Sequence, residues 1–536
     1  MPQNTRQCPQ RTNLLCAERF GKSENSWVIF SELQYSDWKI QRIGSDLTAT
    51  SSTPAARSGA EQARLPRSLG LLNAVSINMS NMVGTGPFIT VPAILATMGG
   101  PQSLLAWLVG ALLAIADGLV FAELGAAIPA SGGSYIFLRE CFGRQRWGHM
   151  MAWMFVWQFL FSGTLEIATS SIGMAEYTGF LWPKLITYRW GVKLLAAGIT
   201  AVAMMALYRK IQDIARLMLV LWMGMLVTAA WVIFTGMTHL STRLLLDFPA
   251  GAWTIGLPFI LGLGNGTMLV MFNFLGYYQI CYLGDEVKQP ARVIPRGVIY
   301  SIIVVTVIDF LISVSFTGVV PWREMVVPGS QAFNAIGSVY MQKIYGPWAS
   351  ALMTVMVEVT AFAATYAMLL GYSRIPYAAA LDGAFFRWFA ELHPTRQFPH
   401  RALLLVGSLC TIACFFDLVQ IITALMLARI LSMFVAQIVG LLLYRKYNPE
   451  AARPFRMWIY PLPALFALVG WLGVFVTPAL QPGGWKYMAY AFGTIGVGFA
   501  AYLILAWRKR DWPFAPPEPD TPAGTSGSAL EAEGSF

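Results

Sequence analysis

The stretch Asn81-Met82-Val83-Gly84-Thr85-Gly86-Pro87-Phe88 interrupts an otherwise continuous apolar run from residue 69 to residue 97. Its two glycines lower helix propensity, and its proline has no backbone N–H to donate. We therefore expect two half-helices joined by an unwound segment. Lipid cannot satisfy the freed backbone groups, so such a segment is tolerated in a membrane only where protein, water or a ligand supplies partners.

The composition of the chain is that of a membrane protein. Its 536 residues are 56% hydrophobic and only 12% charged, whereas an average soluble protein is about 25% charged. Apolar runs of about 20 residues, long enough to cross a bilayer, recur about twelve times. We predict an all-α multi-pass membrane protein with about 12 transmembrane helices, at about 69–97, 104–128, 150–182, 191–207, 213–236, 255–283, 297–320, 347–377, 402–416, 419–444, 457–477 and 487–507.

The basic residues indicate how the chain is oriented. Lysines and arginines are concentrated in alternate connections between the apolar runs, which by the positive-inside rule are cytoplasmic. This pattern predicts a cell-membrane protein with both termini in the cytoplasm, as an even number of spans requires. The formal net charge of +10 comes from these short loops rather than from one basic face or tail, so we expect no nucleic-acid partner.

The distribution of apolar runs divides the chain into three regions. Residues 1–64 are polar without the apolar core of a signal peptide, and we expect a disordered cytoplasmic extension there. Residues 65–510 contain all the apolar runs and form the predicted membrane domain. Residues 511–536 are rich in Pro, Gly, Ser and acidic residues and should be a disordered cytoplasmic tail. Neither metal-site cysteine spacing nor a phosphate-binding or nucleophile motif occurs, so we expect no enzyme activity and no cofactor.

A second interruption lies five runs later. Gly262-Leu263-Gly264-Asn265-Gly266 opens the sixth run, and Asn273-Phe274-Leu275-Gly276-Tyr277-Tyr278 lies in its middle. Interrupted spans at matching positions of two halves point to a transporter with inverted repeats and a substrate site near the bilayer midplane. The alternative is that these glycines only allow close packing of helices.

The two breaks offer opposite helix ends to a ligand. Amides of residues 84–86 lie at the amino end of a half-helix, where the partial positive charge suits a carboxylate. Carbonyls freed around Phe272, Asn273 and Leu275 lie at a carboxyl end and suit an ammonium group. A ligand that carries both charges on one carbon is an α-amino acid.

Several motifs resemble those of a known family. They are the stretch 81–88, Ala122-Glu123-Leu124-Gly125 with the Pro129–Tyr135 loop, and above all Asp285-Glu286-Val287-Lys288-Gln289-Pro290. From about Arg67 to about Arg510 the chain resembles the amino acid-polyamine-organocation (APC) superfamily, in particular its amino acid permeases. The resemblance implies two inverted repeats of five helices, at about 69–236 and 255–444, and two further helices at about 457–507.

The resemblance also implies a role for individual residues. Residues 83–86 would contact the substrate carboxylate, Phe272, Asn273 and Leu275 its amino group, and Phe274 would close over it as a gate. The substrate-binding set is therefore Val83, Gly84, Thr85, Gly86, Phe272, Asn273, Phe274, Leu275 and Gly276. The chain departs from the common amino acid permease pattern at Pro87, where Ile or Val is usual, and at 276–279, where Gly-Tyr-Tyr-Gln replaces the frequent Gly-aromatic-Asp/Glu. The Gly-Pro-Phe sequence resembles that of the polyamine-uptake branch.

The predicted function is secondary transport of amino acids by alternating access, coupled to protons or working by exchange. A polyamine or organic cation transporter of the same fold is the alternative within this class. A channel or a nutrient sensor that does not transport is the alternative from another class. The expected partners are a small-molecule substrate, a proton as the coupling ion and the lipid bilayer, while the sequence leaves the oligomeric state open.

Carboxyl groups within apolar runs are costly and mark functional sites by default. Asp117, Glu166, Asp309 and Glu358 lie near the middle of their runs. We single out Glu166 and Glu358 as a possible proton or cation site, because in the family the third and eighth helices line the central cavity. Each could instead be a carboxyl hydrogen-bonded to a neighbouring helix, and we interpret Asp117 and Asp309 as structural.

Acidic residues near the predicted cytoplasmic helix ends form a possible gate. Glu123, Asp285 and Glu286 could form salt bridges with loop arginines such as Arg139 or Arg296 and latch the inward side. The alternative is that they are solvated loop charges.

Overall fold

The computed structural model describes residues 67, 69–130, 132–143, 147–188, 190–208, 211–393, 398–510 and 512–514, with the backbone alone for 211–222. The predicted extension at 1–64 lies outside this range, and the predicted tail at 511–536 lies largely outside it. The described residues are mostly helical and contain no β-strand beyond an isolated bridge between Leu69 and Val287.

Every predicted apolar run contains a helix. In chain order these helices are α2 (Leu71–Met82) with α3 (Gly86–Met98), α4 (Leu105–Ala127), α6 (Trp147–Leu181), α8 (Gly191–Ala206), α9 (Ile211–His239), α11 (Leu257–Asn273), α12 (Pro290–Val319), α16 (Pro347–Tyr372), α18 (His400–Ala413), α19 (Leu418–Arg429) with α20 (Ala436–Tyr447), α21 (Leu462–Val476) and α22 (Trp485–Lys509). The connections contain α5 (Ser134–Cys141), α7 (Pro183–Thr187), α10 (Thr242–Leu245), α13 (Trp322–Met325), α14 (Gln331–Asn334), α15 (Ile336–Tyr345) and α17 (Arg374–Leu381).

The length and hydrophobicity of the helices are those of a multi-pass membrane protein. Within the described residues, five helical stretches are long and apolar enough to cross a membrane, and α2 and α3 together form a sixth, bent one. Five further apolar helices are shorter. The prediction of an all-α multi-pass fold is confirmed, while the number of twelve spans stays a prediction.

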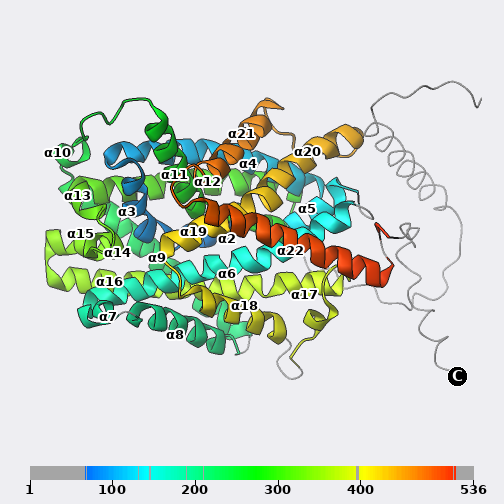
Figure 1. The fold of residues 1–536 in the computed structure, drawn as a ribbon, viewed down its shortest axis with the longest axis horizontal. Helices are drawn as coiled ribbons and strands as arrows, with labels where there is room; N and C mark the ends of the chain where they lie inside the picture. Colours follow the sequence, from blue (N-terminus) through cyan, green and yellow to red (C-terminus); the bar gives the residue numbers. More distant parts are fainter. Residues whose placement is uncertain are drawn as a thin grey trace, which may run out of the picture. The chain divides into compact units, whose positions relative to one another are not determined.

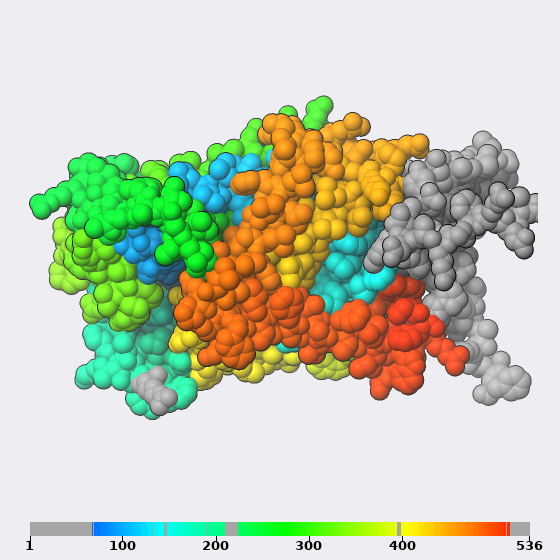
Figure 2. All heavy atoms as spheres, turned by 45° about the horizontal axis from the view of Figure 1, so that its top comes forward, coloured from blue at the N-terminus to red at the C-terminus, as the bar shows by residue number. Residues whose placement is uncertain are grey.

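The long helices lie side by side along one direction (Figure 1). The connecting helices α10, α13 and α15 lie at one end of this bundle, and α5 and α17 lie at the other (Figure 1). We call these the α15 end and the α5 end. The last two helices, α21 and α22, run across one face of the bundle (Figure 2).

The first break lies where the sequence predicts it. Helix α2 ends at Met82, α3 begins at Gly86, and the two are bent by 52°. Pro87 lies in the first turn of α3, where its missing N–H costs nothing because no helical carbonyl is available there. The prediction of two half-helices is therefore confirmed, and Pro87 lies in the first turn of the second one.

The second break differs from the expectation in two respects. Helix α11 ends at Asn273, and the chain continues through turns and two short 3₁₀ helices, Gln279–Tyr282 and Gly284–Glu286, rather than through a second α-helical half. The glycines of 262–266 lie inside the continuous α11, so the expected interruption there is wrong. A Cβ on Gly262 would lie 2.7 Å from the carbonyl oxygen of Thr97, which shows that this glycine allows close packing on α3.

Hydrogen bonds join the irregular segment after α11 to α2 and α12. The backbone N–H of Leu69 donates to Glu286 at 3.0 Å, and Lys288 donates back to Leu69 at 2.9 Å. Asn78 donates to Ser301 at 3.2 Å and accepts from the backbone N–H of Ile280 at 2.9 Å. Helix α2, residues 274–288 and α12 thus form one hydrogen-bonded unit.

Candidate substrate site at the helix breaks

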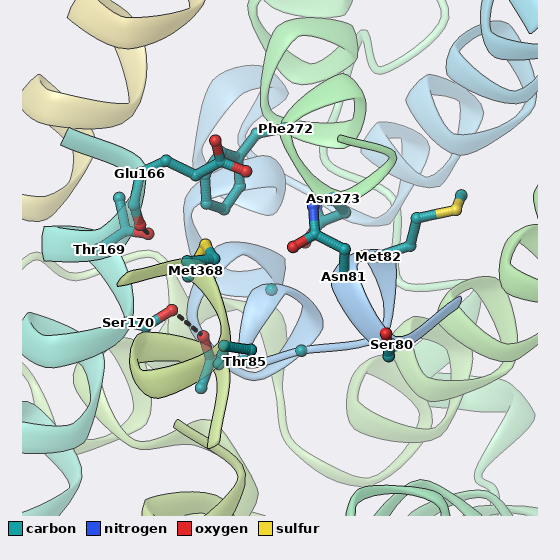
Figure 3. A pocket seen from close by; sticks show the side chains of 14 residues that line it. Ser80, Asn81, Met82, Thr85, Glu166, Thr169, Ser170, Phe272, Asn273 and Met368 are labelled. Carbon is teal, nitrogen blue, oxygen red and sulfur yellow. Dashed lines mark hydrogen bonds between the residues drawn. The ribbon is translucent and has the colours of Figure 1, made fainter. Parts of the chain in front are cut away.

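A cavity lies where the two breaks meet α6 and α16 (Figure 3). The cavity and its mouth contain about 420 Å³ of space free of protein atoms. Its wall is made of glycines and of hydroxyl, amide, small apolar and sulfur-containing side chains, with one aromatic ring and one carboxylate. The lining residues are Ser80, Asn81, Met82, Gly84, Thr85, Gly86, Glu166, Thr169, Ser170, Phe272, Asn273, Ala364, Ala367 and Met368.

The structure brings five of the nine predicted substrate-binding residues to this cavity. Residues 84–86 of the first break and Phe272 and Asn273 at the end of α11 line it. Val83, Phe274, Leu275 and Gly276 are buried but are not among the lining residues. Sequence reasoning found the two breaks, and it did not separate the residues that face the cavity from those that face the protein.

Phe274 differs most from its expected role as a gate. Its side chain is fully buried, with its ring edge-on to Trp107 of α4 at a centroid distance of 6.3 Å. The phenylalanine on the cavity wall is Phe272 (Figure 3). Gly276 has φ 116° and contacts α2, because a Cβ there would lie 2.6 Å from the amide nitrogen of Asn81.

The start of α3 is held in place from two sides. The hydroxyl groups of Thr85 and Ser170 lie 3.3 Å apart (Figure 3). On the other side, Asn273 donates to the hydroxyl of Thr90 at 2.9 Å. Thr85 does not cap α3 with its side chain, so the first amides of this helix are left to other acceptors, as an anion site requires.

Glu166 is the charged residue of the cavity wall. Its Oε2 lies 2.7 Å from Nη2 of Arg429, and it accepts a hydrogen bond from the hydroxyl of Tyr372 at 2.8 Å. Both charged side chains are almost completely buried. The carboxylate therefore reaches the cavity already neutralised by a guanidinium.

Arg429 is the charged residue beside the cavity that our sequence reasoning missed. It is the last residue of α19, inside the predicted apolar run 419–444, and the π-helical turn Ile430–Val435 follows it directly. The signal was present, since a cation within an apolar run is as costly as a carboxylate. Our sequence reasoning applied that cost to acidic residues alone.

The other intramembrane carboxyls lie away from the cavity. Glu358 of α16 is half-buried and accepts a hydrogen bond from the hydroxyl of Thr178 of α6 at 2.7 Å. Asp117 of α4 is buried and accepts a hydrogen bond from the hydroxyl of Tyr277. Among the residues that the structure describes, no three His, Cys, Asp or Glu side chains come together as a metal site requires.

At the α5 end, Glu123 is paired with a residue that we did not expect. Its carboxylate binds Arg445 of α20, with Nε 2.8 Å from Oε1, and accepts the backbone N–H of Met457 at 2.8 Å. Arg139 instead lies 3.6 Å from Asp382. Glu286 contributes its backbone carbonyl to the bond with Leu69, and the side chain of Asp285 is exposed.

At the α15 end, a tyrosine hydroxyl joins three elements. Tyr177 of α6 donates to the carbonyl of Phe88 in α3 at 3.0 Å and accepts the backbone N–H of Gly337 in α15 at 3.0 Å. The rings of Phe88 and Phe316 pack edge to face at 6.1 Å.

A loop ion pair lies outside the spanning helices. A hydrogen bond from Arg323 lowers the pKa of Asp247, so this pair persists to lower pH than an isolated aspartate would allow.

Comparison with known proteins agrees with this geometry. Residues 69–500 match a family model described as amino acid permease. The chain is 29% identical to an uncharacterised transporter of Mycobacterium bovis, over 82% of this chain and 91% of the relative. It is 25% identical to a serine/threonine exchanger of Bacillus subtilis, over 76% and 90% of the two chains. It is also 26% identical to the human cystine/glutamate transporter, over 84% and 88%.

These relatives are transporters and exchangers of amino acids where their names state a substrate, so the expected secondary transporter is confirmed and the polyamine alternative is not favoured. The motif at the first break and the one after the second break both lie within the matched range. The chain belongs to the amino acid permease family.

Proposed function

We propose that this protein transports small neutral amino acids by alternating access around the cavity at the two helix breaks. The observation that carries the proposal is the composition of the cavity wall. It combines the start of α3, the end of α11, several hydroxyl groups and a single carboxylate whose charge is cancelled by Arg429. A wall of this kind suits a zwitterion with a small polar or apolar side chain.

The two charged ends of the substrate would bind at the two breaks. Amides of residues 84–86 lie at the amino end of α3, which suits the carboxylate. Phe272 and Asn273 line the same cavity at the carboxyl end of α11, whose partial negative charge suits the ammonium group. The carbonyls of Phe272 and Leu275, expected to be free, instead accept hydrogen bonds from the N–H of Leu275 at 3.2 Å and from the amide of Asn81 at 3.4 Å. Thr169, Ser170 and Ser80 supply hydroxyl groups for the remaining polar atoms of the substrate.

We infer the orientation of the protein in the membrane from the basic residues of its loops. The α5 end carries Lys288, Arg445 and Lys509, and we assign it to the cytoplasm by the positive-inside rule. The Tyr177 contacts then close the outer side, and the Glu123–Arg445 pair lies on the inner side. Asp285 and Glu286 would belong to the inner gate through the backbone pairing of this segment with Leu69.

Uptake by purified protein in proteoliposomes tests the proposal. We expect saturable uptake of serine, threonine, alanine or asparagine, competed by other neutral amino acids and accelerated when one of them is loaded inside. Flux that does not saturate would instead indicate a channel, and saturable binding without flux would indicate a sensor. Competition by putrescine or spermidine, but by none of the neutral amino acids, would contradict the proposed substrate class.

A further inference from the structure

The ionisable residue of the cavity wall is held by a cation that lies behind it. Glu166 lines the cavity, whereas Arg429 is not among the lining residues and is fully buried. The two are joined at 2.7 Å between Oε2 and Nη2. Any substrate in the cavity therefore experiences the charge of Glu166 together with that of Arg429.

Arg429 is fixed in this position by a polar and aromatic surrounding. Its Nε lies 3.3 Å from the hydroxyl of Ser162, and its Nη1 lies 3.5 Å from the hydroxyl of Tyr278. Its guanidinium lies over the ring of Phe159, 5.1 Å from the centroid. The π-helical turn that begins at the next residue interrupts the regular α-helix at this point, and such turns are frequent at functional sites.

We propose that Arg429 determines the charge selectivity of the cavity. By cancelling the charge of Glu166 it makes the wall neutral, so that a neutral side chain is accepted and a cationic or anionic side chain gains nothing. The proposal rests on the proposed function, namely that the cavity binds an α-amino acid. Because charges interact strongly in a poorly hydrated interior, removing either partner would expose the substrate to the field of the other.

A purely structural role for the pair makes a different prediction. If the pair only stabilised the packing of α19 against α6, removing one partner would lower stability and total uptake equally for all substrates. If Arg429 sets the charge of the wall, removing one partner changes the order of preference among substrates. The ratio of affinities for substrates of equal size and different charge separates the two roles.

The experiment uses asparagine, aspartate and 2,4-diaminobutyrate, which have similar size and neutral, anionic and cationic side chains. For each compound we would measure the inhibition constant against uptake of a labelled neutral amino acid, and its direct binding. The proteins are the wild type, Arg429→Gln, Glu166→Gln and the double variant. Arg445→Gln is the matched control, because it breaks a second buried arginine–glutamate pair that does not line the cavity.

In Arg429→Gln we expect the affinity for diaminobutyrate to rise by about tenfold or more relative to that for asparagine. In Glu166→Gln we expect the affinity for aspartate to rise by a similar factor relative to that for asparagine. The double variant should regain the wild-type preference for the neutral side chain. Arg445→Gln should leave the order of the three affinities unchanged. If Arg429→Gln does not reach the membrane, Glu166→Gln and the double variant still decide the question.

Affinity ratios in Arg429→Gln and Glu166→Gln that equal those of the wild type would overturn the proposal while leaving the proposed function intact. A double variant whose ratios differ from those of the wild type would overturn it as well. A shift of equal size in Arg445→Gln would also overturn it, because the effect would then not belong to the cavity wall. A wild-type protein that binds none of the neutral amino acids would instead overturn the proposed function.

Discussion

The guanidinium of Arg445 binds both carboxylate oxygens of Glu123, with Nε donating to Oε1 at 2.8 Å and Nη2 donating to Oε2. Glu123 is fully buried, and its Oε2 also accepts the backbone N–H of Met457. The pair joins α4, which follows the first break, to α20 and to the segment before α21. A bidentate pair of this kind fixes both side chains and the segments that carry them.

The first prediction concerns this pair. Arg445→Met leaves a buried carboxylate without its cation, and breaking a buried pair in this way costs about 3–5 kcal/mol. We expect a clearly lower apparent melting temperature in detergent. The double variant Glu123→Gln/Arg445→Met should be more stable than Arg445→Met alone. It removes the unpaired charge, while the amide oxygen of the introduced glutamine still accepts the N–H of Met457.

The control for this prediction is Arg387→Met, since Arg387 is exposed and surface charges contribute little. Equal melting temperatures for Arg445→Met and Arg387→Met would show that the Glu123–Arg445 pair does not stabilise the α5 end.

A second prediction compares the two glycines of the first break. A Cβ on Gly86 would lie 2.1 Å from Oδ1 of Asn273, whereas a Cβ on Gly84 would lie 3.7 Å from the Cβ of Ala364. Gly86→Ala must therefore displace the Asn273 side chain, which donates to Thr90 and lines the cavity, or push α3 away from α11, at a cost of about 1–3 kcal/mol. We expect the affinity for the substrate to fall about tenfold or more in Gly86→Ala and to be lost in Gly86→Leu.

Gly84→Ala is the matched control, because Gly84 also lines the cavity and an added Cβ there makes an ordinary contact. Binding measured by scintillation proximity, with membrane insertion followed by fluorescence, separates a lost site from a lost protein. Wild-type affinity in Gly86→Ala would contradict the assignment of the substrate to this break.

The sequence predicted the architecture well because hydrophobic runs and helix breakers are local signals. The 81–88 stretch alone located the bend between α2 and α3. The α11 glycines show the limit of this reasoning, because a glycine that permits close packing has the same local composition as one that interrupts a helix. Only the position of Thr97 opposite Gly262 distinguishes the two cases.

The site was predicted less completely, for a reason that lies in tertiary contacts. Whether Phe272 or Phe274 faces the cavity depends on the rotation of α11 about its axis relative to α4. In the structure the ring of Phe274 packs edge-on against Trp107 of α4. The partner of Glu166 lies far from it along the chain, so no local pattern could pair them. Arg429 was visible as a charge within an apolar run, and its role became visible only through its neighbour.

A third prediction tests the coupling ion. Arg429 neutralises Glu166, so we propose that a coupling proton, if transport uses one, is carried by Glu358, which is half-buried and bonded to Thr178. We expect Glu358→Gln to flatten the pH dependence of uptake, since the amide cannot gain or lose a proton. The measurement is uptake into proteoliposomes over a pH series, with and without an imposed pH gradient.

Thr178→Val is the control for Glu358, because it removes the hydrogen bond and keeps the carboxyl group. It should retain a pH-dependent uptake. A pH profile of Glu358→Gln that coincides with the wild type would remove this residue from the mechanism.

The last prediction concerns the closure of the α15 end by Tyr177. Its hydroxyl bonds α3 and α15 at once, through the carbonyl of Phe88 and the N–H of Gly337. In Tyr177→Phe the carbonyl of Phe88 and the N–H of Gly337 lose the hydroxyl that bonds them. As long as the α15 end is closed these groups are buried, so their lost hydrogen bonds cost about 1–3 kcal/mol. Opening of this end lets water satisfy them, so the variant should populate the opened state about five- to hundredfold more than the wild type.

Access to a cysteine in the cavity measures this opening. Ala367→Cys places a thiol on the cavity wall, and Cys8 and Cys16 are replaced by serine, since the other four cysteines are buried. We expect a membrane-impermeant thiol reagent, added outside, to label Tyr177→Phe faster than the parent. Tyr340→Phe is the matched control, because Tyr340 donates to the carbonyl of Val232 and does not bond α3. Equal labelling of the parent and Tyr177→Phe would show that this hydroxyl does not hold the α15 end closed.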